Sequence, residues 1–211
     1  AIPIALKKRD ILAAAQSGTG KTAAFLLPIL TELLEKKQEN KTILRALILV
    51  PTRELATQIS KAVEDFSKYM DNISSIAMVG GVSKKEQEKK IIKGIDILVA
   101  TSGRLMEHLK EKTVDLSSVT TVVIDEVDTL LDMGFLEDIE KILPHVGPKR
   151  QIMMFSATMN QNVKKLAKEF LTDPVVIEVA QQRSAVKIID QQIVLVDEAN
   201  KAAALSYIIG S

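Results

Sequence analysis

The segment at residues 15–22 combines residue types that bind phosphate. Its sequence is Ala-Gln-Ser-Gly-Thr-Gly-Lys-Thr, between an apolar run at 11–14 and a second apolar run that begins at residue 23. Gly18 and Gly20 allow a tight turn whose backbone N–H groups face an anion, and a helix beginning near Gly20 adds the positive end of its dipole. Lys21 can then reach the β- and γ-phosphate oxygens of a nucleotide, and the Thr22 hydroxyl can ligate Mg²⁺. The predicted nucleotide-binding residues are Ala15, Gln16, Ser17, Gly18, Thr19, Gly20, Lys21 and Thr22.

Residue 15 departs from the general phosphate-loop pattern, which begins with glycine, because the chain has Ala15 there. An ordinary strand-to-helix turn with a solvated lysine is the alternative interpretation of the segment. A strand before the loop and a helix after it are nevertheless the context that a phosphate-binding loop requires. The assignment therefore calls for support from residues elsewhere in the chain.

That support comes from an acidic cluster, Asp125, Glu126 and Asp128, which directly follows an apolar run at 119–124. A carboxylate at the end of a buried strand is costly unless a cation compensates it, and Mg²⁺ shared between Asp125 and nucleotide phosphates would do so. Glu126 could orient and deprotonate a water that attacks the γ-phosphate. The alternative is an acidic helix N-terminus, which the helix dipole favours by itself.

The elements that must position these residues alternate between strands and helices. Apolar runs predict strands at 11–14, 46–50, 74–79, 95–100, 119–124, 151–155 and 175–179, with helical periodicity between them. This order predicts an α/β fold with βαβ crossovers and a mainly parallel sheet, whose ligands bind at the carboxyl ends of the strands. Polar clusters follow six of the strands and should meet at one edge: residues 17–22, 51–53, 80–81, 101–104, 125–128 and 156–158.

Helix starts and minor residues carry further expectations. Thr52 and Asn160 are predicted N-caps, and Ser83 has capping-box spacing at the start of a polar helix. Lysines 84, 85, 89 and 90 of that helix are expected on a solvated face, and the methionines at 153 and 154 in the core. His108 and His145 lack ligand spacing, so we expect them on a helix surface and in a loop.

Composition narrows the classes of function. The 46% hydrophobic content is enough for a sizeable core, and no apolar run or signal-peptide pattern indicates a membrane segment. Without cysteine the chain has no disulfide or thiolate metal site, which is compatible with a cytoplasmic or a nuclear setting. The net charge of +1 neither requires nor excludes a polyanionic partner. With 3% aromatic residues, nucleic-acid contacts would fall mainly on the sugar-phosphate backbone.

Residues 180–211 differ from the rest of the chain. Residues 180–187 are polar and resemble a linker, 188–196 predict a strand, and 199–209 predict a helix. One strand and one helix cannot bury a core, so 188–211 is expected to be the start of a second domain cut short.

In combination these segments resemble the first RecA-like lobe of a DEAD-box ATP-dependent RNA helicase. The resemblance rests on AQSGTGKT at 15–22, PTRELA at 51–56, the glycines at 80–81, TSGR at 101–104, DEVD at 125–128 and SAT at 156–158, in the order of the family. It implies a RecA-like P-loop fold, a three-layer α/β/α sandwich, over residues 1–179. It also implies an enzyme that couples ATP hydrolysis to RNA binding and local duplex unwinding, with ATP and Mg²⁺ as cofactors.

The same resemblance assigns roles to individual residues. Gly18, Gly20, Lys21 and Thr22 would bind ATP and Mg²⁺, Asp125 would act through the metal, and Glu126 would be the base. Asp128 would pair with Ser156 and Thr158 and so couple the nucleotide state to RNA binding. The implied RNA contacts are Pro51, Thr52, Arg53, Gly81, Thr101, Gly103 and Arg104. Helix N-termini and arginine suit phosphates, and contacts to 2′-hydroxyls would distinguish RNA from DNA.

Four departures from the family qualify the comparison. The tetrad is DEVD rather than DEAD, and Ser102 replaces the usual proline of TPGR. The family's adenine-recognising glutamine segment would lie before Ala1, and its second lobe, with the arginine fingers, is absent from the sequence. We therefore expect an excised, monomeric fragment of weak activity, whose partners are RNA and the second lobe. The alternatives are a RecA-like DNA translocase and a non-catalytic RNA-binding scaffold of the same fold.

Overall fold

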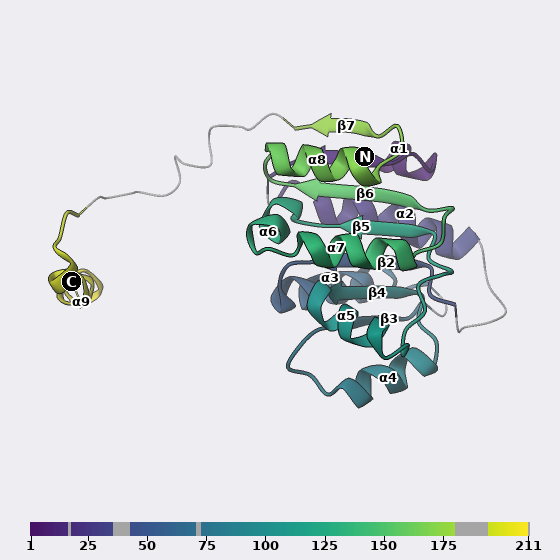
Figure 1. The fold of residues 1–211 in the computed structure, drawn as a ribbon, viewed down its shortest axis with the longest axis horizontal. Coiled ribbons are helices and arrows are strands. Elements are labelled where there is room, and N and C mark those ends of the chain that lie inside the picture. Colours follow the sequence, from purple (N-terminus) through teal and green to yellow (C-terminus); the bar gives the residue numbers. More distant parts are fainter. Residues whose placement is uncertain (17, 36–42, 71–72, 180–193, 211) are drawn as a thin grey trace. The chain divides into compact units, whose positions relative to one another are not determined.

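The computed structural model describes residues 1–16, 18–35, 43–70, 73–179 and 194–210, which fall into two units divided after residue 180 (Figure 1). The first unit is built on a seven-stranded sheet in the order β3-β4-β2-β5-β6-β1-β7. Every strand pair is parallel, which confirms the expected α/β fold. The strands are β1 (Ile11–Ala14), β2 (Ala46–Val50), β3 (Ser75–Met78), β4 (Ile97–Thr101), β5 (Thr121–Ile124), β6 (Gln151–Ser156) and β7 (Val175–Glu178).

Helices cover both faces of the sheet. Figure 1 shows α5 (Ser102–Lys110), α7 (Leu136–Ile142) and α8 (Gln161–Phe170) in front of the strands, and α2 (Lys21–Glu35) and α3 (Arg53–Phe66) behind them. The front layer includes α6 (Val127–Asp132), and α1 (Ile2–Leu6) packs with α2 and α3. The remaining helices of this unit are α4 (Lys84–Ile92), after edge strand β3, and the 3₁₀ turn η1 (Leu143–His145). The expected three-layer sandwich is therefore present.

Two apolar cores follow from the two-residue period of the strands. Leu47 and Leu49 of β2 face the core under α5 to α8, whereas the intervening Ile48 and Val50 face the core under α1 to α3. All five residues of β2 are buried. The continuous apolar run in the sequence is what a strand covered on both sides requires.

Three helix starts were predicted from capping residues, and two are confirmed. The Thr52 hydroxyl accepts a hydrogen bond from the Leu55 N–H at 3.2 Å, and Asn160 Oδ1 accepts one from the Val163 N–H at 2.9 Å. Ser83 occupies the N-cap of α4 but makes no side-chain capping bond, so the predicted capping box is wrong there. Because α3 and α8 begin within a few residues of the ends of β2 and β6, their N-termini lie at the carboxyl edge of the sheet.

The second unit is described at residues 194–210. It contains the 3₁₀ turn η3 (Glu198–Asn200) and α9 (Lys201–Gly210), and none of the residues of α9 is buried. The helix expected at 199–209 is present. The expected linker at 180–187 and most of the strand expected at 188–196 lie outside the described residues, and residues 194–196 are not in a strand. Within the described ranges, no helix has the length and apolar character needed to cross a membrane.

Asp10 ties three segments of the first unit together. It is 8% exposed, and its two carboxylate oxygens accept hydrogen bonds from the Ile152 N–H at 2.8 Å and the Thr172 N–H at 2.7 Å. The start of β6 and the residue that leads into β7 are thus joined to the residue before β1.

The Asp10→Asn variant keeps the shape of the side chain but replaces one acceptor oxygen with a donor. One of the two backbone N–H groups then faces an amide NH₂, so we expect a loss of about 2–3 kcal/mol in the free energy of unfolding. Urea denaturation measures the effect, and Asp65→Asn, at an exposed position of α3, should stay within about 0.5 kcal/mol of the original protein. Equal stability of the two variants would contradict the assigned role.

Candidate functional site

The loop after β1 has the conformation expected of a phosphate cradle. The Ala15 N–H donates to the Ser156 carbonyl at 2.9 Å, which holds the loop entrance beside β6. Gly18 and Gly20 have φ angles of +80° and +86°, in the left-handed region that favours glycine. The Thr19 hydroxyl donates to the Gln16 carbonyl at 2.7 Å, and α2 begins two residues later, at Lys21. Ser17 lies outside the described residues.

Lys21 is the residue of this loop that most clearly requires a ligand. Its Nζ atom is shielded from solvent and has no hydrogen-bond partner among the described residues. An ammonium group without water or a partner costs several kcal/mol, so this arrangement favours an anion bound at the loop. Phosphate oxygens at the N-terminus of α2 would supply both the negative charge and the acceptors.

Asp125 lies at the carboxyl end of β5, separated from β1 by β6 alone. Its backbone N–H donates to the Leu49 carbonyl at 3.0 Å, so the residue continues the ladder between β2 and β5. The side chain is 3% exposed. Burial raises the pKa of the Asp125 carboxyl to about 6, against the opposing charge of Lys21 and the hydrogen bond from the Glu126 N–H. The Lys21 ammonium and the Asp125 carboxylate are therefore close enough to interact. Asp125 directly follows β5, and Lys21 begins the helix that follows β1, two strands whose axes are about 10 Å apart.

This donor set fits a magnesium ion that is shared with a nucleotide. The described residues contain no group of three acidic or histidine side chains that could hold a metal by themselves. Mg²⁺ commonly takes one or two protein oxygens and fills its remaining positions with phosphates and waters. The Asp125 carboxylate and the Thr22 hydroxyl are such oxygens, and burial of Asp125 makes a nearby cation favourable.

Glu126 has an unusual backbone. Its φ and ψ angles are both 52°, in the left-handed region, which is strained for a residue with a side chain. The residue is the N-cap of α6 and its side chain is half-buried. Such strain costs about 1–3 kcal/mol and concentrates at functional sites, because the fold must hold it in place. Here the chain turns sharply after β5, so that Asp125 and Glu126 both remain at the edge of the sheet.

Asp128 connects α6 with the segment after β6. Its Oδ2 atom accepts hydrogen bonds from the Thr158 N–H at 2.9 Å and the Thr158 hydroxyl at 3.0 Å, and Oδ1 accepts a longer one from the Ala157 N–H at 3.4 Å. Burial would raise the pKa of Asp128, but the Thr158 and Ser156 hydroxyls and these N–H groups outweigh it and lower the pKa. Ser156 Oγ lies near the carboxylate but makes no well-aligned hydrogen bond to any described residue.

The seven residues expected to contact RNA follow β2, β3 and β4. Pro51 and Thr52 lead into α3, which begins at Arg53. Gly81 has a φ of +80°, and a methyl group on it would lie 2.5 Å from Arg53 Nη1, so the guanidinium packs directly on the turn. Thr101 is the N-cap of α5, and Gly103 and Arg104 lie in the first turn of that helix.

Arg104 is held by three hydrogen bonds. It donates to the Val79 carbonyl at 3.1 Å, the Val82 carbonyl at 2.9 Å and Glu107 Oε2 at 2.8 Å. Ser102, in place of the family's proline, is 1% exposed, and its hydroxyl has no hydrogen-bond partner in the described part of the chain. The loops expected to bind RNA thus form a group of their own along β2, β4 and β3.

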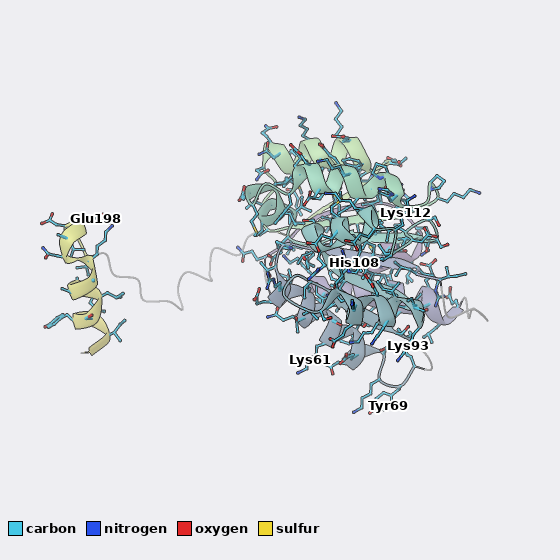
Figure 2. All side chains as sticks on the ribbon, turned by 60° about the horizontal axis from the view of Figure 1, so that its bottom comes forward. Lys61, Tyr69, Lys93, His108, Lys112 and Glu198 are labelled. Carbon is cyan, nitrogen blue, oxygen red and sulfur yellow. The ribbon has the colours of Figure 1, made fainter. Side chains whose placement is uncertain are left out.

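The expectation for His108 is wrong. The residue, labelled in Figure 2, is 0% exposed on α5, three residues after the core residue Leu105. Its ring nitrogens contact Thr113 Oγ1 at 2.7 Å and Gln87 Oε1 at 3.1 Å. The spacing from Leu105 was the signal in the sequence. His145 is exposed at the end of η1, and Met153 and Met154 are core residues, as expected.

The buried polar network around His108 was missed in the sequence. Gln87 is 2% exposed on a helix whose other residues as far as Lys90 are charged, and nothing in these neighbours indicated burial. The lysines at 85, 89 and 90 of the same helix are exposed, as expected, while Lys84 forms an ion pair with Glu111.

Comparison with known proteins identifies the family. Residues 1–166 match the family model for DEAD/DEAH box helicases. The chain belongs to the DEAD/DEAH box helicase family. Members similar to it include the probable ATP-dependent RNA helicase ddx27 of Dictyostelium discoideum, with 45% identity over 92% of this chain, and the DEAD-box ATP-dependent RNA helicase RhpA of Helicobacter pylori, with 40% identity over 97%. The ATP-dependent RNA helicase DeaD of Escherichia coli is 42% identical over 82% of this chain.

The chain spans only part of these DEAD/DEAH box relatives. The matched region is 25% of the Dictyostelium protein, 40% of the Helicobacter protein and 27% of the Escherichia protein. The family match covers the segments that form the edge described above, from the loop after β1 to the start of α8.

The Asp125→Asn variant should be more stable than the original chain when no metal is present. The pKa of Asp125 is raised from 3.8 to about 6, so the ionised carboxylate opposes folding above pH 6, by roughly 2–3 kcal/mol at about 1.4 kcal/mol per unit. The increase in the free energy of unfolding caused by asparagine should be largest near pH 7. It should decrease as the pH falls from 6 to 4, because Asp125 of the original chain then becomes protonated in both the folded and the unfolded state.

Thermal denaturation with a chelator, at pH 7 and pH 4, measures this gain. Asp132→Asn, an exposed change at the end of α6, should show no such pH-dependent gain. A destabilised Asp125→Asn protein at pH 7 would contradict the electrostatic interpretation of this DEAD/DEAH box site.

Proposed function

We propose that this chain provides the ATP-binding lobe of an ATP-dependent RNA helicase, which couples ATP binding and hydrolysis to RNA binding and local duplex separation. The observation that carries the proposal is the Lys21 ammonium, buried and without a partner among the described residues, close to the buried Asp125 carboxylate. The names of the similar helicases support the same activity.

At the nucleotide, the residues of the loop and of β5 have separate tasks. The N–H groups of residues 18–22 and the Lys21 ammonium bind the β- and γ-phosphates, while Thr22 and Asp125 hold Mg²⁺. When bound, Mg²⁺ neutralises charge on the phosphate oxygens. Glu126 orients a water and accepts its proton, and the strained backbone keeps this carboxylate at the edge of the sheet.

RNA binds along the loops that follow β2, β3 and β4. The N-termini of α3 and α5 carry N–H groups and a positive dipole end that suit backbone phosphates. Arg53 and Arg104 add positive charge beside the turn at residues 80–81. Contacts to 2′-hydroxyls would favour RNA over DNA. The proposed contacts are Pro51, Thr52, Arg53, Gly81, Thr101, Gly103 and Arg104.

Asp128 links the two functions. Its carboxylate is bonded to Thr158 and lies near Ser156, so a movement of α6 on nucleotide binding would pull on the segment after β6. The second RecA-like lobe of the family would complete both sites, and its arginines typically contribute about 10³–10⁵ to the rate of phosphoryl transfer.

Nucleotide binding is testable on the 211-residue chain itself. Lys21→Ala should lower the affinity for Mg²⁺-ADP by at least about tenfold, because the removed charge contacts phosphate in a buried position. Titration with a fluorescent ADP analogue measures the change, and Lys164→Ala, an exposed position of α8, should leave the affinity unchanged. Equal affinities of the Lys21→Ala and Lys164→Ala variants for Mg²⁺-ADP would contradict the assignment of Lys21 to the nucleotide site.

Hydrolysis requires a two-lobe protein, in which the second lobe of the Helicobacter relative follows residue 211. Its ATPase rate should rise with single-stranded RNA but not with DNA of the same sequence, and should exceed that of the 211-residue chain by about 10³ or more. Glu126→Gln should reduce the stimulated rate by about 10²–10⁴ and leave ADP binding intact.

Three results of that experiment oppose the proposal. Equal stimulation by DNA would favour a DNA translocase of the same fold. An unchanged rate in the Glu126→Gln variant would favour a non-catalytic RNA-binding scaffold. Near-equal turnover with and without the second lobe would contradict its role in catalysis.

A further inference from the structure

The turn at residues 80–81 is held by side chains at both of its ends. Before the turn, the Val79 carbonyl accepts hydrogen bonds from Gln87 Nε2 at 3.0 Å and from Arg104 Nε at 3.1 Å. After the turn, the Val82 carbonyl accepts one from Arg104 Nη2 at 2.9 Å. Because β3 is an edge strand of the sheet, no further strand in the described ranges restrains this turn from outside. Two helices, α4 and α5, therefore restrain the turn through side chains.

The orientation of the Gln87 amide is fixed by what it faces. The Val79 carbonyl can only accept, so the Gln87 NH₂ must point toward it, and the amide oxygen then faces His108 Nε2 at 3.1 Å. His108 Nε2 must carry the proton in this arrangement, and Nδ1 can accept from the Thr113 hydroxyl at 2.7 Å. Reversing the amide would place two acceptors against each other at Val79. The Val79 carbonyl thus sets which way Gln87 points, and His108 supports that orientation by donating to the amide oxygen.

Burial makes this arrangement rigid. Gln87 is 2% exposed and His108 is 0% exposed, so neither can exchange its partner for water without opening the packing of α4 and α5. Burial first, and then the charges of Lys84 and Arg104, hold the pKa of His108 below its usual value, against the opposing charges of Glu88 and Glu111. A buried network in which every member has a partner specifies one geometry.

The turn in its fixed position supports Arg53. The Arg53 guanidinium packs on residues 80 and 81, where an added methyl group would lie 3.3 Å and 2.5 Å from its nitrogens. Three of the proposed RNA contacts, Arg53, Gly81 and Arg104, therefore depend on one turn. The position of that turn depends in part on the hydrogen bond from Gln87 to the Val79 carbonyl, although Gln87 is itself too deeply buried to touch RNA.

We propose that Gln87 and His108 are positioning residues for RNA binding, which pre-organise the turn at residues 80–81 together with Arg53 and Arg104. This inference rests on the proposed function, because it assumes that RNA passes along these loops. When the turn is already ordered, RNA binding does not have to immobilise the arginines, and this entropic cost is avoided. Loss of the network should therefore weaken RNA binding without changing the affinity for nucleotide.

The test separates positioning from stability with two variants. Gln87→Met has nearly the same shape but leaves the His108 N–H without an acceptor, so it should lower the melting temperature by roughly 3–8 °C. The double variant Gln87→Met with His108→Leu replaces both partners with apolar groups. The Thr113 hydroxyl, released from His108 Nδ1, can turn to the carbonyl of residue 108 at 3.2 Å, and Val79 keeps its bond from Arg104, so stability should largely return.

Binding of a ten-nucleotide oligo(U) to the 211-residue chain is followed by NMR, through the amide signals of residues 80, 81 and 104. Both variants should bind oligo(U) about 3- to 10-fold more weakly than the original chain and should bind Mg²⁺-ADP within about twofold of it. Gln58→Met, the same exchange at an exposed position of α3, should change neither affinity.

Two outcomes overturn the inference alone: oligo(U) affinity within twofold of the original in the Gln87→Met variant, or recovery of affinity together with stability in the double variant. The latter would reduce the network to a structural role. If the original chain binds Mg²⁺-ADP but its signals at residues 80, 81 and 104 do not respond to oligo(U), the RNA part of the proposed function fails, and this inference fails with it.

Discussion

A lysine ammonium and an aspartate carboxylate, both shielded from water, lie near each other at one edge of a parallel sheet. Neither is satisfied by the other: Lys21 Nζ has no hydrogen-bond partner among the described residues, and burial still raises the pKa of Asp125 to about 6. Such an arrangement lowers the stability of the folded chain, and only a rigid, well-packed scaffold can tolerate it. The two apolar cores on either side of the sheet provide that scaffold.

The order of the strands divides the two proposed sites between two halves of this edge. The loops assigned to the nucleotide follow β1, β6 and β5, which are neighbours, and the loops assigned to RNA follow β2, β4 and β3, which are also neighbours. The halves meet between β2 and β5, where the Asp125 N–H bonds to the Leu49 carbonyl. In the proposed function, the fold thereby separates a nucleotide and an RNA along one edge and still joins their sites through a single strand pair.

Much of this arrangement could be predicted from the sequence, because buried parallel strands have a distinctive pattern. The apolar runs at 46–50 and 119–124 located β2 and β5, and the polar residues after them then had to lie at the carboxyl edge.

The pairing order of the strands could not be predicted, since it depends on contacts between segments far apart in the chain. The burial of Gln87 was missed for the same reason: α4 and α5 bury polar residues against each other, and a hydrophobic pattern does not record such contacts. For His108, the helical spacing from Leu105 was a signal that the sequence did contain. The left-handed backbone of Glu126 was likewise hidden, because it reflects how β5 joins α6.

The two halves of the edge differ in how far their polar groups are satisfied. On the nucleotide side, Lys21 Nζ and the Ser156 hydroxyl have no well-aligned partner in the described ranges, and Glu126 is strained. On the RNA side, Val79, Gln87, His108 and Arg104 bond to one another, and the buried Ser102 hydroxyl is the exception. Groups without partners gain the most when a ligand supplies them, whereas satisfied groups bind without rearranging. In the proposed function, the nucleotide half therefore gains its missing partners from its ligand, and that gain can drive a change of structure. In the RNA half, the polar groups named above, apart from the Ser102 hydroxyl, already have partners, so this surface can bind its proposed ligand without rearranging. Asp128 of α6 bonds to Thr158, in the segment after β6, and both belong to the nucleotide half. In the proposed function, a structural change on nucleotide binding is therefore passed to this segment through the Asp128 carboxylate.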